Sequence, residues 1–292
     1  MLKIGITSRA LFDLDSCHLI YEQFGLEAYK DHQISNENNS LNPGQAFPLV
    51  QKLLKLNNKF SGEKLVEVIL LSRNTADTGL RIFNSIRSHG LDITKAAFCG
   101  GESPHLYAKS FGAHLFLSTD FEDCKSSLTQ GIASARIMAS KKSIDHGEIL
   151  KVAFDGDAVI FSEDSQKIFD KHGLKVFNKN ELEHANKPLS GGPFKSFLHE
   201  LFKVQKSFPR KECPIRIALV TARSAPSHER VIKTLRDWKI RIDESLFLGG
   251  MNKTNFLKDF GADIFFDDQI ENCKAACLEV PTGQVINFNS RY

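Results

Sequence analysis

The chain lacks the features that mark secreted and membrane proteins. None of its six cysteines belongs to a CxxC pair, and only Cys273 and Cys277 stand close together, at a spacing that suits one helix face. This pattern favours free thiols in a reducing compartment over a disulfide framework. No stretch of about 18 apolar residues occurs, and Arg9 and Asp13 interrupt the apolar N-terminal run. We therefore predict no transmembrane helix, no signal peptide and a cytoplasmic location.

Charge of one sign is also scarce. The net charge is only +3 at pH 7, and no run of lysine and arginine is dense enough to follow a phosphate backbone, so we expect no nucleic-acid partner. With 41% hydrophobic and 25% charged residues, the composition is that of an ordinary globular protein. A length of 292 residues allows two domains with a core each. Assembly into a homo-oligomer stays open.

An internal repeat is the most informative feature that the sequence does contain. Residues 70–125 align without a gap with residues 219–274, for example LLSRNTADTGLRIFNSIR with LVTARSAPSHERVIKTLR. Upstream, residues 3–12 align with residues 151–160. A repeat of this length indicates two copies of one structural unit. We predict domain boundaries of 1–148 and 149–292.

Each copy has the pattern of an α/β domain. Short apolar runs, typical of buried parallel strands, alternate with segments of helical period such as 81–89 and 230–238. This alternation predicts a parallel sheet with helices on both faces. The expected strands are 3–7, 66–72, 96–99 and 114–117 in the first copy, and 151–155, 215–221, 245–248 and 263–266 in the second.

In each copy the connection after the first strand is longer than a crossover helix requires. We interpret the excess as an inserted helical cap, at about 162–214 in the second copy. Apolar residues recur at helical spacing in 42–60 and in 191–208. Packing against other elements is the preferred explanation for both stripes.

The segment KVAFDGDAVIF carries the first chemical signal. It reads as a buried strand that ends in Asp155, turns through Gly156 and presents Asp157. Two carboxylates at this position are costly unless a cation neutralises them, and oxygen ligands suit Mg²⁺. An ordinary surface turn is the alternative, although such a turn would normally lack the apolar flanks.

Polar residues also follow three other strands or turns of the second copy. Asp267 and Asp268 end the run FFDDQ, Thr221 ends LVT, and Lys253 follows a glycine-rich turn. The carboxyl ends of parallel strands meet at one edge of the sheet, where a lysine and a hydroxyl can hold a phosphate. For Asp267 or Asp268, capping of the next helix is the alternative.

The order DxDxV, strand-threonine, lysine and DD resembles the haloacid dehalogenase superfamily of phosphohydrolases. Nearly the whole chain is similar to the type I cytosolic 5′-nucleotidases and their bacterial relatives, through AFDGDAVIFSED, HANKPLSGGPFKSFL, ECPIRIALVTARSAPS, FLGG, IFFDDQ, GQAFPLV, TGLRIFNSI and GGESPHLYAKSFGAHLFLSTD. The resemblance implies a tandem pair of haloacid-dehalogenase-like units. It also implies a Mg²⁺-dependent enzyme that hydrolyses nucleoside 5′-monophosphates. A phosphatase for another small phosphate ester and a noncatalytic nucleotide-binding regulator are the alternatives.

The resemblance also implies residue roles. Asp155 would be the nucleophile that forms an aspartyl-phosphate, and Asp157 the general acid and base. The phosphate clamp would consist of Thr221 and Lys253, although the flanks of Lys253 depart most from the family pattern. The metal ligands are expected among Asp155, Asp157, Asp267 and Asp268.

The expected substrate contacts rest on fewer observations. Backbone N–H groups near Gly156 would hold phosphate charge. In HANKPL, the residues His184, Asn186 and Lys187 either face the nucleotide or serve as a loop and cap. Arg223 either reaches the phosphate or pairs with a surface acid.

The first copy lacks the acid set. The alignment places Thr7 and Arg9 opposite the first acid pair, and Ser118 and Thr119 opposite the second, while Pro104 stands opposite the lysine. A neutral hydroxyl without an adjacent base is a poor nucleophile, and an arginine repels Mg²⁺. We expect a catalytically dead copy in a structural role; an anion site at Arg9 is the alternative.

Overall fold

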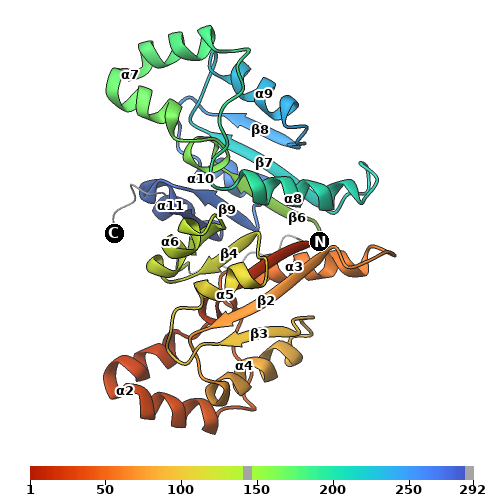
Figure 1. The fold of residues 1–292 in the computed structure, drawn as a ribbon, viewed down its shortest axis with the longest axis vertical. Coiled ribbons are helices and arrows are strands. Elements are labelled where there is room, and N and C mark those ends of the chain that lie inside the picture. Colours follow the sequence, from red (N-terminus) through yellow and green to blue (C-terminus); the bar gives the residue numbers. More distant parts are fainter. Residues whose placement is uncertain (141–146, 287–292) are drawn as a thin grey trace. The chain divides into compact units, whose positions relative to one another are not determined.

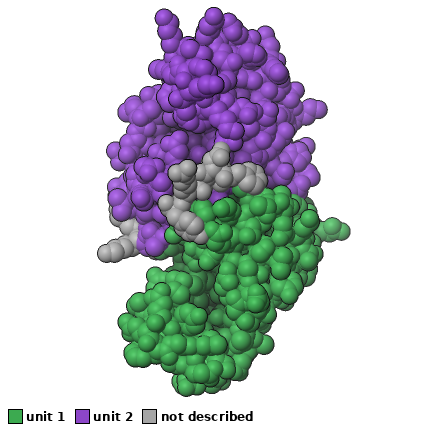
Figure 2. All heavy atoms as spheres, turned by 60° about the vertical axis from the view of Figure 1, so that its left-hand side comes forward, with its two compact units in different colours: residues 1–137 green, residues 138–292 purple. Residues whose placement is uncertain are grey.

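The structure is a computed structural model that describes residues 1–140 and 147–286. The chain divides into two compact units, Met1–Ile137 and Met138–Tyr292, which Figure 2 shows in different colours. Among the described residues, no helix is both long and apolar enough to cross a membrane.

Unit 1 contains a parallel sheet in the order β3-β2-β1-β4-β5, of which β2, β3 and β4 are labelled in Figure 1. Its strands are β1 (Leu2–Ile6), β2 (Val66–Ser72), β3 (Lys95–Phe98), β4 (Leu115–Ser118) and β5 (Ala133–Ile137). Its helices are α1 (Ser8–Leu11), α2 (Asp15–Ser35), α3 (Phe47–Asn58), α4 (Ala76–Ser88), α5 (His105–Ser110) and α6 (Phe121–Thr129).

Unit 2 repeats this order as β8-β7-β6-β9-β10. Its strands are β6 (Leu150–Phe154), β7 (Ile215–Thr221), β8 (Glu244–Phe247), β9 (Ile264–Asp267) and β10 (Thr282–Val285). Its helices are the short turn η1 (Gly156–Ile160), α7 (Asp164–Glu183), α8 (Lys195–Lys206), α9 (His228–Asp237), α10 (Thr254–Phe260) and α11 (Ile270–Ala276).

The predicted α/β class is confirmed, and so are the eight predicted strands, each within one residue. Both copies have the apolar runs Val66–Ser72 and Ile215–Thr221 as strands with the predicted bounds. The sequence did not reveal the fifth strand of either sheet, β5 or β10. In β10 the residues TGQV include one aliphatic side chain, that of Val285, so they lack the apolar run that indicates a buried strand, although all four are buried.

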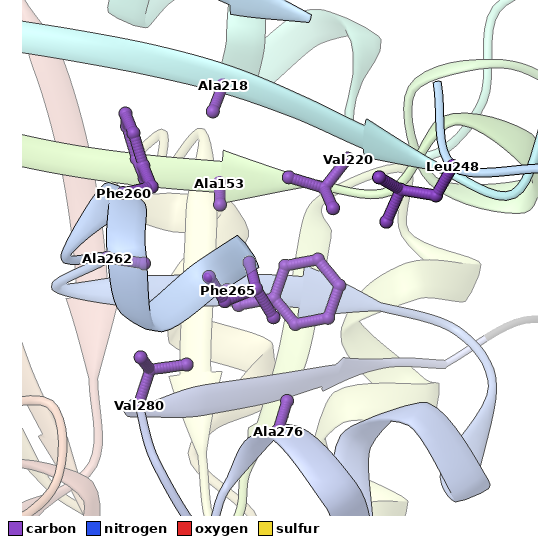
Figure 3. Packing of buried hydrophobic residues seen from close by; sticks show 10 residues of the cluster. Ala153, Ala218, Val220, Leu248, Phe260, Ala262, Phe265, Ala276 and Val280 are labelled. Atoms are coloured by element: carbon purple, nitrogen blue, oxygen red, sulfur yellow. The ribbon is translucent and has the colours of Figure 1, made fainter. Parts of the chain in front are cut away.

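Helices cover both faces of the sheet in unit 2. Phe154 of β6 and Phe266 of β9 contact the ring of Phe197 on α8. The preceding residues, Ala153 and Phe265, belong to a different cluster, which includes residues of α10 and α11 (Figure 3). Because successive side chains of a strand point to opposite faces, α8 and the α10–α11 pair lie on opposite sides of the sheet.

The insertion after the first strand contains two helices with different surroundings. α8 is amphipathic and buries Phe197 and Leu201 against the sheet, so its stripe is a packing stripe as predicted. α7 buries few of its residues and is bent at Gly173, which has φ +75°. α2 of unit 1 is bent in the same way at Gly25, where φ is +84°. A left-handed φ favours glycine, which explains this residue at both bends.

A second pair of glycines holds each insertion against the turn after the first strand. A Cβ at Gly192 would lie 2.3 Å from the carbonyl oxygen of Phe161, and a Cβ at Gly44 would lie 2.8 Å from the carbonyl carbon of Phe12. The N–H of Gly192 donates to the carbonyl of Ile160 at 2.8 Å. Neither position has room for a side chain.

The core of unit 2 yields the first testable prediction. Leu257 of α10 is fully buried in the cluster of Figure 3, so Leu257→Ala should lower the free energy of unfolding by about 2–5 kcal/mol. Leu278→Ala is the matched control, because this leucine is 68% exposed and its truncation should cost less than about 0.5 kcal/mol. Urea unfolding followed by circular dichroism measures both. Equal midpoints for the two variants would contradict the packing described above.

Candidate active site

The first predicted acid lies where the strand order of unit 2 reverses. β6 pairs with β7 on one side and with β9 on the other, so Phe154 faces Leu219 and Phe266. The N–H of Asp155 then donates to the carbonyl of Phe266 at 2.8 Å. Polar residues that follow these strands are therefore brought together at one edge of the sheet, the position at which parallel α/β sheets bind ligands.

Lys253 joins two of the acids. Its Nζ lies 2.8 Å from Asp155 Oδ1 and 2.6 Å from Asp267 Oδ2, and all three residues are buried. Burial alone would lower the pKa of this lysine, but the charges of Asp155 and Asp267 outweigh burial and raise the pKa. Lys253 directly precedes the first turn of α10. The helix therefore fixes the backbone position of the lysine, and its side chain extends from there to the acids.

Three carboxylates form a cluster that fits a divalent cation. One oxygen each of Asp155, Asp267 and Asp268 lies within 4.8 Å of the others. Burial raises the pKa of Asp155 to about 7, with Asp267 adding to the effect and Lys253 opposing it. Burial also raises the pKa of Asp268 to about 8, and the charges of Asp155 and Asp267 add to it. Crowded carboxylates of this kind suit a hard cation such as Mg²⁺, which binds oxygen ligands.

Asp267 also organises the chain that follows it. Its Oδ1 accepts the N–H of Gln269 at 2.8 Å, just before α11 begins, and Asn272 Nδ2 donates to its Oδ2 at 3.1 Å. Gln269, and not Asp267, is the N-cap residue of α11, and no side chain caps this helix, so the capping alternative is not supported for Asp267. Asn272 was not among the residues singled out from the sequence.

The turn after β6 is closely packed against the end of β7. A Cβ at Gly156 would lie 3.3 Å from Thr221 Oγ1, so the glycine lets the two strand ends approach. Thr221 is buried, and its hydroxyl oxygen accepts the N–H of Arg223 at 3.3 Å. Ala158 continues the turn with φ +59°, a conformation that residues other than glycine adopt infrequently.

The Asp157 carboxylate lies against an arginine and is not one of the three clustered acids. Arg223 Nε and Nη2 donate to its two oxygens, each at 2.7 Å. Nη1 of the same arginine donates to Glu181 Oε2 at 2.6 Å. Burial alone would lower the pKa of Arg223, but hydrogen bonding to Asp157, together with both acidic charges, raises it. Arg223 thus binds one partly buried and one buried acid, and no surface acid.

The residues predicted from HANKPL lie in the turn that ends α7. Nδ1 of His184 lies 2.9 Å from the carbonyl of Asn180, within the last turn of the helix. Asn186 Oδ1 accepts a hydrogen bond from Lys233 at 2.6 Å, and Arg230 donates to the carbonyl of Lys187 at 2.9 Å. These contacts connect the turn to α9, and they fit the loop-and-cap alternative. A nucleotide contact by these three residues stays a prediction.

The similarity to known proteins is strong at the level of sequence. A model of the 5′-nucleotidase family matches residues 1–291. The chain belongs to the 5′-nucleotidase family. It is 40% identical to human "Cytosolic 5′-nucleotidase 1B" over 286 residues, which are 94% of this chain and 47% of that protein. The chain therefore spans about half the length of this curated relative.

A solved structure, histidinol dehydrogenase from Elizabethkingia anophelis, gives a TM-score of 0.24 at 9% identity. The alignment covers 96% of the nucleotidase-family chain and 52% of the other chain. At this TM-score the likeness carries no argument about the fold.

Besides Asn272, sequence reasoning missed Glu181 and Arg230 in the site of this 5′-nucleotidase-family chain. Glu181 is 1% exposed and accepts hydrogen bonds from Arg223, from Arg230 at 3.0 Å and from Ser165 at 2.9 Å. The internal repeat contains a signal for the pair of Glu181 and Arg230, because it aligns Arg230 with Arg81 of unit 1. In unit 1, Arg81 donates to Gln33 at 3.1 Å. Both copies therefore have an arginine at the same position, on α4 and on α9. This shared arginine indicates a polar partner on the long helix of its own unit, α2 or α7.

Glu181→Gln tests this buried network. Burial alone would raise the pKa of Glu181, but Arg223 outweighs burial and lowers the pKa below its ordinary 4.5. The contribution of Glu181 to stability is therefore complete above about pH 4.5 and is lost as the pH falls through the lowered folded-state pKa. Near pH 7 the substitution should cost about 3 kcal/mol or more, since Arg223 and Arg230 lose the charged partner that is buried with them.

Glu183→Gln is the matched control on the same helix, because Glu183 is 59% exposed and pairs only loosely with Lys179 at 3.8 Å. It should change the free energy of unfolding by less than about 0.5 kcal/mol. Urea unfolding at several pH values measures both variants. A Glu181→Gln deficit that does not shrink below pH 4.5 would contradict a charged Glu181 in the folded state.

Proposed function

We propose that the chain is a Mg²⁺-dependent 5′-nucleotidase, which hydrolyses nucleoside 5′-monophosphates to nucleoside and phosphate through an aspartyl-phosphate. The observation that carries the proposal is the contact of Lys253 with both Asp155 and Asp267 at the edge of the sheet in unit 2. Family membership supports the same substrate class.

We further propose a division of labour between the two halves, as two haloacid-dehalogenase-like copies. Residues 149–292 would be the catalytic copy, since they hold all four acids, and residues 1–148 would be a degenerate copy. The equal strand order of the two sheets supports this proposal. In the insertion at about 162–214, α7 would be the cap, because α8 packs on the sheet.

In the first chemical step, a carboxylate oxygen of Asp155 attacks the phosphorus of the substrate. The bond between phosphorus and the ribose 5′ oxygen breaks, and Asp157 donates a proton to that oxygen, so that a neutral nucleoside leaves. Lys253, the Thr221 hydroxyl and backbone N–H groups near Gly156 hold the negative charge of the transferring group.

In the second step, Asp157 accepts a proton from a water molecule, and the water oxygen attacks phosphorus. The bond between phosphorus and Asp155 breaks, which releases phosphate and regenerates the carboxylate. Arg223 bears on both steps because it binds the two oxygens of Asp157. Proton donation requires Asp157 to give up at least one of these two hydrogen bonds, and Glu181 keeps the arginine in place meanwhile.

Mg²⁺ would be held by Asp155, Asp267 and Asp268, with Asp157 as the fourth expected ligand. When bound, it shields the negative charge of the phosphate so that an anionic carboxylate can approach. The carboxylate cluster supports this assignment, and Lys253 supplies the positive charge that the protein itself contributes.

A substrate panel tests the proposed activity. Phosphate release should be fastest with nucleoside 5′-monophosphates, slower with sugar phosphates and p-nitrophenyl phosphate, absent in EDTA and restored by Mg²⁺, because crowded carboxylates repel the substrate without a cation. Faster release from the other esters would favour a general phosphatase. If Asp267→Asn left the Mg²⁺ concentration dependence unchanged, Asp267 would not be a metal ligand.

The nucleophile is tested by Asp155→Asn. This variant should lose at least about a thousandfold in kcat, because an amide cannot form the aspartyl-phosphate. Asp259→Asn, an exposed position on α10, is the matched control and should keep the turnover of the unchanged chain. Circular dichroism verifies that both variants fold. Turnover of Asp155→Asn within tenfold of the control would exclude Asp155 as the nucleophile.

A further inference from the structure

Unit 1 contains a cavity at one edge of its own sheet. This edge is equivalent to the edge that carries the acids in unit 2. The cavity has a volume of about 430 Å³, within the range of small-molecule sites. Its lining includes Thr7, Arg9, Ser118 and Thr119, the four residues that the repeat aligns with the acids of unit 2. Unit 1 therefore has a cavity of ligand size at the four positions where it lacks the acids of unit 2.

Three polar atoms of the lining are buried without a hydrogen-bond partner: Thr7 Oγ1, Arg9 Nε and Asn74 Nδ2. Thr7 is only 7% exposed. Asn74 uses its other side-chain atom, Oδ1, to accept a hydrogen bond from Tyr29 at 2.9 Å. A buried polar atom without a partner is costly, and the two nitrogen atoms can only donate. These atoms therefore indicate a ligand that accepts hydrogen bonds.

The charges of the lining favour an anion. Arg9, Lys30 and Arg73 line the cavity with Asp120 and Asp123, which gives a formal lining charge of +1, three cations less two anions. The equivalent edge of unit 2 carries four aspartates. With hydroxyls and an arginine at the four aligned positions, unit 1 can hold an anion without a metal ion, and none of these four side chains is a carboxylate that could act as a nucleophile.

Two aromatic side chains also line the cavity. Tyr21 and Tyr29 of α2 line it, with ring centroids 6.2 Å apart and an interplanar angle of 84°. His18 stacks on Tyr21 at 6.1 Å and 16°. Flat aromatic surfaces of this kind pack well against another planar ring. The lining of the cavity thus combines hydrogen-bond donors and cationic side chains with two aromatic rings.

We propose that this cavity binds a nucleoside monophosphate without hydrolysing it. The phosphate contacts Thr7, Arg9 and Asn74, and the base packs against Tyr21 and Tyr29. This site lies within unit 1, and its existence does not depend on turnover in unit 2. The proposal follows the anion-site alternative given above for Arg9 instead of a purely structural role for this half of the chain.

Photolabelling tests the site on the full chain in EDTA, with 8-azidoadenosine 5′-monophosphate as the probe and unlabelled AMP as the competitor. Peptide mapping should find AMP-protected label within α2, Asp15–Ser35. At subsaturating probe, Arg9→Gln should reduce this label at least about tenfold, since a charge-assisted contact to phosphate is lost. Thr7→Val, which keeps the side-chain volume, should reduce it in the same direction.

Arg87→Gln is the matched control, because Arg87 is exposed on α4 and contacts Asn84 instead of the cavity. It should leave the label in α2 unchanged. Inorganic phosphate should compete only at concentrations at least about tenfold higher than AMP, since it lacks a ring. The proposal is overturned if α2 carries no AMP-protected label, if Arg9→Gln labels like Arg87→Gln, or if phosphate competes as well as AMP.

Discussion

The ion pairs of Lys253 with Asp155 and Asp267 are the interaction on which the acid cluster of unit 2 depends. Two buried carboxylates, Asp155 and Asp267, lie within 2.8 Å of the Lys253 ammonium group, and a third, Asp268, lies close by. Without a cation, this much negative charge at the end of two adjacent strands would repel itself and destabilise the folded state. The parallel register of the strands brings the acids together. Lys253, at the start of α10, supplies the positive charge that offsets their mutual repulsion.

The two units show how far side-chain chemistry can diverge on one topology. Both have the same strand order, a bent long helix and an arginine that reaches back to that helix. In unit 2 the arginine meets Glu181, and in unit 1 it meets Gln33. The apolar strands specify the sheet in both cases, while the residues after the strands set the charge at its edge: four aspartates in unit 2, and hydroxyls with an arginine in unit 1.

The strands and the strand-end acids were predictable because both depend on short-range patterns, apolar runs followed by polar residues. Glu181 was not, because its partners Arg223 and Arg230 approach it from the loop after β7 and from α9, which are distant in sequence. The position of the Asp157 carboxylate could not be predicted either. The DGD pattern indicates a turn of the backbone, but the direction of the side chain depends on its contact with Arg223. Short strands with mixed polarity, such as β10, carry no signal in the sequence alone.

The close approach at Gly44 and Gly192 couples two segments that otherwise look independent. In unit 2, the backbone after β6 carries Asp157, and Gly192 begins the approach to α8. With main chain touching main chain, neither segment can shift without displacing the other. Because the backbone of Val159 and Phe161, which Gly192 contacts, follows Asp157 in the same turn, a shift of the insertion at Gly192 would also displace the turn that carries the proposed proton donor.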